Sequence, residues 1–404
     1  MKVAAVICEY NPFHNGHLSQ IRALRRLGID AVVAVLGGSF TQRGEAALAD
    51  PYVRAKAAVA SGAADLVIEL PFPYSAAPAR YFARAGVFLA DALGFCDCLS
   101  FGCEDAALGP LNEIARALRS EAFSAALAAL REDRKYAVVG SPVLRETALA
   151  GLVPDEALTM LRKPNNILAL EYLRAIEELS SPLSPLPLPR IGGGHGDTKL
   201  PEGTVASAGA LREALFSEGI ERWTPFLPPE SLAAFCKAAG DGIAPASLHI
   251  AERAVLYALR SSGEPFSRFA EAGGGLGEAI RKEAKSASSL SGLYAALPTK
   301  RYPAARIRRA VLSCLFGVRE EDQNAPPAFT VLLAANETGL SLLHHREKGG
   351  IPIVTKPADG AADLSGTRGY ELYRKAQDFF TLCAPRIGAA SDPLKKSPFI
   401  LSPH

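Results

Sequence analysis

VAAVICEYNPFHNGH, residues 3–17, joins six consecutive apolar residues to a polar turn that ends in two histidines. A continuous apolar run of this length is typical of a strand that is buried on both faces of a sheet. Leu18, Ile21 and Leu24 then recur at helical spacing, which indicates an amphipathic helix after the turn. This stretch is therefore expected to form a strand, a turn and a helix.

The same alternation continues through the first third of the chain. Further strands are expected at residues 31–36, 65–70 and 96–101, and helices at 51–60 and 79–93. Strands that alternate with helices form a parallel sheet with right-handed crossovers. The predicted fold class is α/β: an N-terminal Rossmann-like, doubly wound parallel sheet with a mainly helical C-terminal domain.

A proline-rich segment, PFLPP at residues 225–229, is the expected boundary between two domains, 1–225 and 226–404. Residues 180–190 fit either a proline-rich linker or a short edge strand. The other expected elements are one long helix at 113–130, helices at 166–179 and 205–215, mostly helix over 231–316, and late strands at 329–334 and 351–355.

The composition is that of a globular protein. Of 404 residues, 49% are hydrophobic and 21% charged, and the formal net charge of +2 excludes a uniformly basic coat for nucleic acid. Seven irregularly spaced cysteines indicate reduced thiols. No apolar run approaches the ~18 residues of a membrane span. We expect a cytoplasmic chain without a membrane partner.

The turn after the first strand is the first chemical signal. In doubly wound sheets ligands bind at the carboxyl ends of strands, and a helix start offers free N–H groups to phosphate. Gly16 lets a phosphate chain come close, and His14 and His17 can donate hydrogen bonds to charge that develops on an α-phosphate. A solvated histidine pair or half a metal site is the alternative, but no third ligand has suggestive spacing, so no metal ligand is assigned.

This strand–HxGH–helix arrangement resembles the adenylyl-transferring nucleotidyltransferase superfamily. That superfamily carries a later phosphate motif of the form I-S-x-T-x-I-R, and VASAGALR at residues 205–212 is similar to it. Ser207 and Arg212 are in register, whereas Gly209 stands where a hydroxyl residue is usual. The resemblance implies a second phosphate contact at the start of the helix expected there.

A narrower resemblance covers most of the chain. Nine ordered blocks are similar to the bacterial tRNA(Met) cytidine acetate ligase family: CEYNPFHNGH, GGSFTQRGEAA, DPYVRAKAAV, ADLVIELPFPYS, FGCED, KPNNILALEYL, LPRIGGG, VASAGALR and LPTKRYPAARIRRAV. This resemblance implies an ATP-dependent ligase. Acetate and ATP form acetyl-adenylate, and the acetyl group then passes to N4 of the wobble cytidine of elongator tRNA(Met). ATP is the nucleotide substrate, and Mg²⁺ is expected to accompany it.

The predicted site follows from these blocks. The expected catalytic residues are His14, His17, Arg43, Ser207 and Arg212, with Arg43 placed beside acetate and phosphate by the resemblance. Gly102 ends a strand, and Asn165 and Asn166 also fit a plain helix cap. The expected ATP-binding residues are Ile7, Cys8, Glu9, Tyr10, Asn11, Pro12, Phe13, His14, Asn15, Gly16, His17, Leu18, Gly102, Asn165, Asn166 and Arg190.

Residues 284–319 contain seven basic residues and no acidic one. Tyr294 and Tyr302 interleave with them, as stacking on unpaired bases favours. Arg301 and Arg308 are expected to share one helix face. A solvated basic helix face is the alternative. The window predicts a tRNA surface, with Lys300, Arg301, Tyr302, Arg306, Arg308 and Arg309 as its contacts.

Two other functions fit parts of the pattern. A nucleotidyltransferase for small molecules would join a nucleotide to a phosphomonoester and would not need the basic window. A nucleotide-sensing RNA-binding protein would bind without turnover. The role of His195, the basis of selectivity for acetate and tRNA, the general base for the cytidine amine and the oligomeric state are not defined by the sequence.

Overall fold

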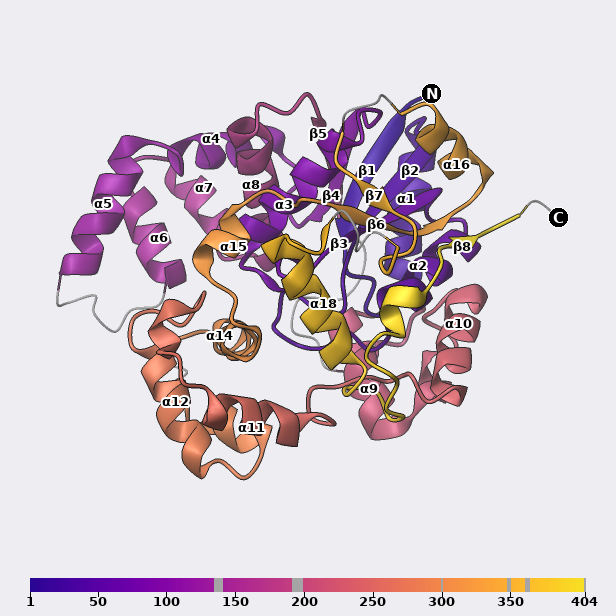
Figure 1. Cartoon of the computed structure of the whole chain (residues 1–404). Coiled ribbons are helices and arrows are strands. Elements are labelled where there is room, and N and C mark those ends of the chain that lie inside the picture. The colour runs from indigo at the N-terminus through magenta and orange to yellow at the C-terminus, as the bar shows by residue number, and fades with distance from the viewer. Residues whose placement is uncertain (134–140, 191–198, 299–300, 347–349, 360–363, 403–404) are drawn as a thin grey trace.

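The computed structural model describes all residues except 134–140, 191–198, 299–300, 347–349, 360–363 and 403–404 (Figure 1). Its described residues form one eight-stranded sheet in the order β5-β4-β1-β2-β3-β6-β7, with β8 also paired to β6. The strands are β1 (Val3–Cys8), β2 (Ala31–Gly37), β3 (Leu66–Leu70), β4 (Cys98–Cys103), β5 (Ser184–Pro189), β6 (Thr330–Ala335), β7 (Ile353–Val354) and β8 (Phe399–Ile400).

Strand order reverses at β1. The chain proceeds from β1 to β2 and β3 on one side, and then returns to place β4 and β5 on the other. All of these neighbours pair in parallel, so their carboxyl ends share one edge of the sheet. A crevice at such a reversal is where open α/β sheets bind ligands. The residues that follow β1 and β4 therefore lie at the expected binding edge.

Helices cover both faces of the sheet. Val3 and Ala5 of β1 pack in one apolar cluster with α3 and α8, whereas Ala4 and Val6 pack in another with α1 and α2. This alternation buries the strand on both sides. The helices of this part are α1 (Asn15–Arg26), α2 (Pro51–Ala60), η1 (Tyr74–Ala76), α3 (Ala79–Ala92), α4 (Leu108–Ala117), α5 (Glu121–Glu132), α6 (Ser141–Leu149), α7 (Asp155–Met160), α8 (Pro164–Glu178), α9 (Ala208–Glu218) and η3 (Ile220–Trp223).

The second half of the chain is mainly helical but also completes the sheet. β6 lies antiparallel to β3, and β7 and β8 extend from it. Helices α11, α12 and α14 lie below the sheet in Figure 1. The domain boundary at 225/226 stays a prediction. The helices here are α10 (Pro229–Gly240), α11 (Glu252–Ser261), η4 (Phe266–Arg268), α12 (Leu276–Ser286), α13 (Leu290–Ala296), α14 (Ala304–Phe316), α15 (Glu320–Asn324), α16 (Glu337–His344), α18 (Arg368–Phe380) and η5 (Pro393–Lys395).

The predicted α/β class is confirmed, and the proline-rich segment after residue 180 forms edge strand β5, where a missing N–H is tolerated. The single helix predicted at 113–130 is wrong. Ser120 interrupts it by capping α5, because its hydroxyl accepts a hydrogen bond from Phe123 N at 3.1 Å. All seven cysteines are free thiols. Over the described residues, none of the helices has the length and apolar character that crossing a membrane requires.

Candidate active site

The two histidines of the HxGH turn form the start of α1. His14 is the N-cap residue, and its Nδ1 accepts a hydrogen bond from Gly16 N at 3.0 Å. His17 Nδ1 accepts from His14 N at 3.3 Å, and the two rings stack with centroids 3.8 Å apart. Because each Nδ1 accepts, each neutral ring carries its proton on Nε2. The cap therefore presents two Nε2–H donors beside the free backbone N–H groups of the helix start.

Both imidazoles are held neutral. Burial lowers the pKa of His14 to about 3, and the charges of Arg190 and Arg212 act in the same direction. Burial also lowers the pKa of His17, followed by the effects of His14 and Arg190. These effects place both arginines close to the histidines, although Arg190 follows β5 and Arg212 lies on α9. A negatively charged ligand fits this cluster because it neutralises the arginines and accepts from both rings.

The low pKa of His14 predicts acid-sensitive folding. Between the usual value of 6.5 and the folded value of about 3, the unfolded chain binds a proton that the folded chain does not. The free energy of unfolding should then fall as pH falls, by up to about 1.4 kcal/mol per unit. When the pH is lowered from 6.5 to 4.5, the free energy of unfolding measured with urea should fall by about 2–3 kcal/mol more in the wild type than in His14→Asn, which keeps a capping side chain. Equal losses in the two proteins would contradict the assignment.

Gly16 makes room for the His14 ring. A Cβ at this position would lie 2.9 Å from His14 Cε1 and 3.0 Å from its Nδ1. We expect Gly16→Ala to displace the imidazole and lower the catalytic rate at least tenfold, with a small effect on unfolding. Gly109→Ala in α4 is the matched control, because a Cβ there meets nothing within 4 Å. The catalytic rate of both variants is measured at saturating ATP. An unchanged rate in Gly16→Ala would show that the position of the His14 ring does not affect catalysis.

The remaining predicted residues of the turn shape it through backbone and buried contacts. Asn11 Oδ1 accepts from Leu48 N at 2.8 Å, and the Glu9 carboxylate accepts from Gln42 N at 2.7 Å. Tyr10 and Phe13 are buried and pack against the His17 ring. These contacts fix the histidines rather than offer polar side-chain groups to a ligand. The predicted nucleotide contacts of residues 7–18 stay predictions.

Asn15 bonds to two segments that are far from it in the sequence. Its side chain donates to Thr204 O at 2.9 Å and Pro225 O at 3.1 Å, and its backbone N–H donates to Phe226 O at 2.8 Å. These bonds bring the chain before and after α9 against the start of α1. Two helix N-termini thus converge at one place.

The second predicted phosphate motif forms the start of α9. Ser207 is its N-cap, and the hydroxyl accepts from Ala210 N at 3.0 Å. Arg212 donates to the Asn11 carbonyl at 3.0 Å, which ties α9 to the first turn. Burial lowers the pKa of Arg212, and nearby Arg43 acts in the same direction. The structure therefore brings together the five residues predicted as catalytic, which lie after β1, after β2 and on α9.

The carboxyl ends of β4 and β5 lie at the same edge of the sheet as the end of β1. Arg190 donates to Asn165 Oδ1 at 2.7 Å, and Asn165 donates to Glu104 Oε1 at 2.6 Å. Gly102 has open space where a Cβ would lie, so a ligand can approach its backbone. Asn166 is fully buried and accepts from Glu104 N at 3.0 Å. Asn166 therefore anchors α8, while Asn165 and Arg190 stay candidate nucleotide contacts.

Sequence reasoning missed two site residues. Glu104 orients Asn165, and its signal in the sequence was its place in the FGCED block, shortly after the strand predicted at 96–101. Arg54 lies in the DPYVRAKAAV block, on the helix predicted at 51–60, and the structure buries it rather than placing it on a solvated face. Its buried guanidinium donates to four backbone carbonyls, those of Glu9, Gly37, Gly38 and Ala49, at 2.6 to 2.9 Å. Arg54 thus holds the ends of β1 and β2 together.

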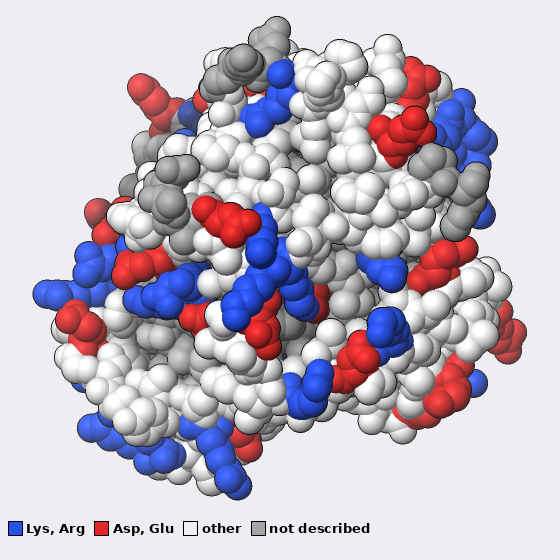
Figure 2. Space-filling model, turned by 45° about the vertical axis from the view of Figure 1, so that its right-hand side comes forward, with Lys and Arg blue, Asp and Glu red and all other residues white. Residues whose placement is uncertain are grey.

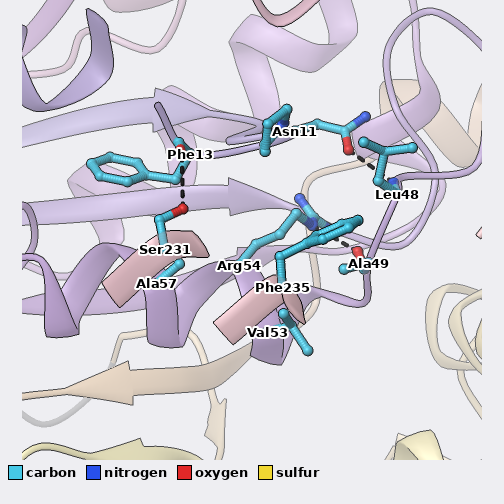
Figure 3. A pocket seen from close by; sticks show the side chains of 10 residues that line it. Asn11, Phe13, Leu48, Ala49, Val53, Arg54, Ala57, Ser231 and Phe235 are labelled. Carbon is cyan, nitrogen blue, oxygen red and sulfur yellow. Dashed lines mark hydrogen bonds between the residues drawn. The ribbon is translucent and has the colours of Figure 1, made fainter. Parts of the chain in front are cut away.

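A small cavity lies beside Arg54 (Figure 3). It measures about 10 Å³, room for one water at most, and its wall includes Asn11, Phe13, Arg54, Ser231 and Phe235. Ser231 of α10 donates to the Phe13 carbonyl at 2.8 Å. A nucleotide does not fit there. The cavity marks the packing that supports the histidine turn from α10.

The predicted RNA-contact residues are only partly at the surface. Tyr302 is 4% exposed and its hydroxyl donates to the Gly274 carbonyl, so base stacking on its ring is wrong for this conformation. Arg301 lies before α14, so it does not share a helix face with Arg308. Lys300 lies outside the described residues. Basic and acidic side chains are interspersed on the face shown in Figure 2. An RNA contact on that face would therefore involve a small group of basic residues rather than a broad basic surface.

The described residues include no group of three or more His, Cys, Asp or Glu side chains able to hold a metal ion. The donors gathered at this edge of the sheet are imidazole, guanidinium, amide and backbone N–H groups, which suit phosphate oxygens rather than a cation. A magnesium ion that arrives with ATP fits this site only when the phosphates supply most of its ligands.

Comparison with known proteins shows which family the chain resembles over its length. Residues 1–392 match the family model described as HIGH Nucleotidyl Transferase. The chain is 33% identical over 387 residues to the tRNA(Met) cytidine acetate ligase of Caldanaerobacter subterraneus, with 95% of both chains covered. It is 32% identical over 374 residues to the relative of the same name from Lysinibacillus sphaericus, covering 89% of this chain and 90% of the relative. The crystal structure of Thermotoga maritima TmcAL bound with alpha-thio ATP matches it with a TM-score of 0.90 and 26% identity over the whole of both chains.

Proposed function

The chain belongs to the HIGH nucleotidyl transferase family of tRNA(Met) cytidine acetate ligases, and on that premise we propose that it activates acetate with ATP and acetylates N4 of the wobble cytidine of elongator tRNA(Met). The observation that carries the proposal is the convergence of two capped helix starts, two neutral Nε2–H donors and Arg212 at the reversal point of the sheet. The reaction takes place in the cytoplasm, where its tRNA is found.

In the first step an acetate oxygen attacks the α-phosphorus of ATP. A new P–O bond forms, the bond to the β-phosphate bridge breaks, and pyrophosphate leaves. His14 and His17 donate to the α-phosphate oxygens as charge builds there, and Arg212 and Arg43 stabilise that charge. Asn165, held by Glu104 and Arg190, positions the nucleoside beside open Gly102. Magnesium supplies further charge neutralisation on the phosphates when bound.

In the second step the N4 amine of the cytidine attacks the acetyl carbonyl. A C–N bond forms, AMP leaves, and one proton passes from nitrogen to solvent. The mixed anhydride hydrolyses readily, so the site must exclude water until tRNA arrives. The helical second half, including the exposed Arg301 near the start of α14, is the proposed place of the tRNA backbone.

A labelling experiment tests the proposal. The protein is incubated with ATP, carbon-13 acetate and either elongator tRNA(Met) or a second tRNA, and the hydrolysed tRNA is examined by mass spectrometry. We expect labelled N4-acetylcytidine from tRNA(Met) alone, and acetate-dependent exchange of pyrophosphate into ATP without any tRNA. Exchange that requires a phosphomonoester instead of acetate would support a small-molecule nucleotidyltransferase. ATP binding without any exchange would support a sensor, and either result would reject the ligase.

A further inference from the structure

Two arginines that the sequence assigns to RNA form hydrogen bonds within the protein instead. Arg309 of α14 donates through Nη1 to the Gln42 carbonyl at 3.0 Å, and through Nε and Nη2 to Glu271 Oε2 at 3.0 and 2.5 Å. Arg308 donates to Glu45 Oε1 at 2.7 Å. The side chains of Arg309 and Glu271 are only 14% and 16% exposed. Both arginines therefore bind the loop that follows β2.

This loop and α14 also touch through their backbones. Gly44 has φ +75°, and a Cβ there would lie 2.5 Å from Arg309 N and 2.6 Å from Arg308 Cβ. Only glycine meets both demands without strain or a clash. The loop is thus seated on α14 by one backbone contact and by the two arginines, Arg308 and Arg309.

The same loop reaches the histidine turn on its other side. The Gln42 N–H donates to Glu9 Oε1 at 2.7 Å, while the Gln42 carbonyl accepts from Arg309. One residue therefore connects α14 to the end of β1. Arg43 follows directly, and its charge is felt by Arg212, as are the charges of Glu45 and Arg308. The position of Arg43 relative to the phosphates thus depends on contacts made by the second half of the chain.

We propose that Arg309, oriented by Glu271, is a positioning residue for acetate activation, which sets Arg43 for the α-phosphate through Gln42 and makes the first chemical step depend on α14. The inference rests on the proposed ligase function. Arg309 does not touch the substrate. A guanidinium fork spans Glu271 and Gln42 at once, which the single ammonium of lysine does not. Its loss should lower the rate of adenylate formation more than the affinity for ATP, because the other phosphate donors lie on α1 and α9.

The test uses the full-length protein without tRNA. Acetate-dependent pyrophosphate exchange is measured for the wild type, Arg309→Ala, Arg309→Lys and the control Arg260→Ala. Arg260 of α11 lies in the same helical region and donates to two backbone carbonyls, those of Ala284 in α12 and of Ala287 just after it. Calorimetric titration with ATP gives the folded, binding-competent fraction of each variant, and thermal unfolding gives its stability.

We expect kcat to fall at least tenfold in both Arg309 variants, with the ATP dissociation constant within about threefold of the wild type, and to stay within about twofold in Arg260→Ala. Should Arg309→Ala not fold, Arg309→Lys decides alone. Wild-type kcat in a folded Arg309 variant overturns the proposal, as does a loss of kcat that matches the loss of binding-competent protein. Absence of exchange in the wild type would instead overturn the ligase function itself.

Discussion

His17→Ala is expected to lower acetate-dependent pyrophosphate exchange by about 10²–10³-fold, the usual effect of removing one donor to a developing negative charge. The ring is neutral and its Nδ1 accepts from the His14 N–H, so its one free donor is Nε2–H. That donor lies at a helix start and next to the His14 ring, 3.8 Å away between centroids. Because alanine supplies no donor, the loss should appear in kcat and persist at saturating ATP.

A second histidine provides the control for this experiment. His249 is exposed and lies before α11, and His249→Ala should leave exchange unchanged. Removal of His17 also takes away one capping hydrogen bond, which is worth about 1 kcal/mol, so thermal unfolding of both variants is measured in parallel. Exchange in folded His17→Ala within tenfold of the wild type would exclude His17 from the transition state.

Arg54→Ala is expected to destabilise the protein by about 3–5 kcal/mol, the usual range for a buried charged group whose partners are left unpaired. Its guanidinium donates to four carbonyls and is 4% exposed. Without it, the carbonyls of Glu9, Gly37 and Gly38 lose their common donor. The histidine turn should then loosen at lower temperature than the rest of the sheet unfolds.

Lys56→Ala on the same helix is the control, because Lys56 is exposed and its ammonium lies over the Phe399 ring at 5.0 Å. That contact is worth about 0.5–1 kcal/mol. Urea unfolding of both variants gives the comparison. A loss below about 1 kcal/mol in Arg54→Ala would show that water replaces the guanidinium at these carbonyls.

The sequence predicts the first half of the fold well because each strand there is a buried apolar run next to an amphipathic helix. The pairing of β6 with β3 was not predictable in this way, since 259 residues lie between Leu70 and Thr330 and no local pattern links the two strands. The helix predicted at 113–130 failed because alanine is helix-forming on both sides of Ser120. The capping role of Ser120 depends on the turn of the chain, which composition does not define.

In the predicted site, too, local patterns were predicted correctly, whereas features that depend on tertiary contacts were not. His14, His17, Ser207 and Arg212 belong to short motifs whose chemistry depends on local spacing, and the structure gathers them. Tyr302 was misinterpreted and Arg54 was missed because burial decides their roles. The sequence around an aromatic residue in a basic window does not distinguish a ring that stacks on a base from one that packs in the core, as the Tyr302 ring does. Arginine on a helix is likewise ambiguous until its neighbours are known.

The antiparallel pairing of β6 with β3 has a consequence for the chain during its synthesis. Until Thr330–Ala335 leaves the ribosome, the outer side of β3 exposes a row of unpaired amide groups on a strand that is apolar apart from Glu69. Such an open border invites association between nascent copies. A fragment that ends at residue 225 would lack β6 and leave the edge of β3 permanently unpaired. We therefore do not expect the part of the chain that holds the histidine turn to fold into a stable, soluble fragment on its own.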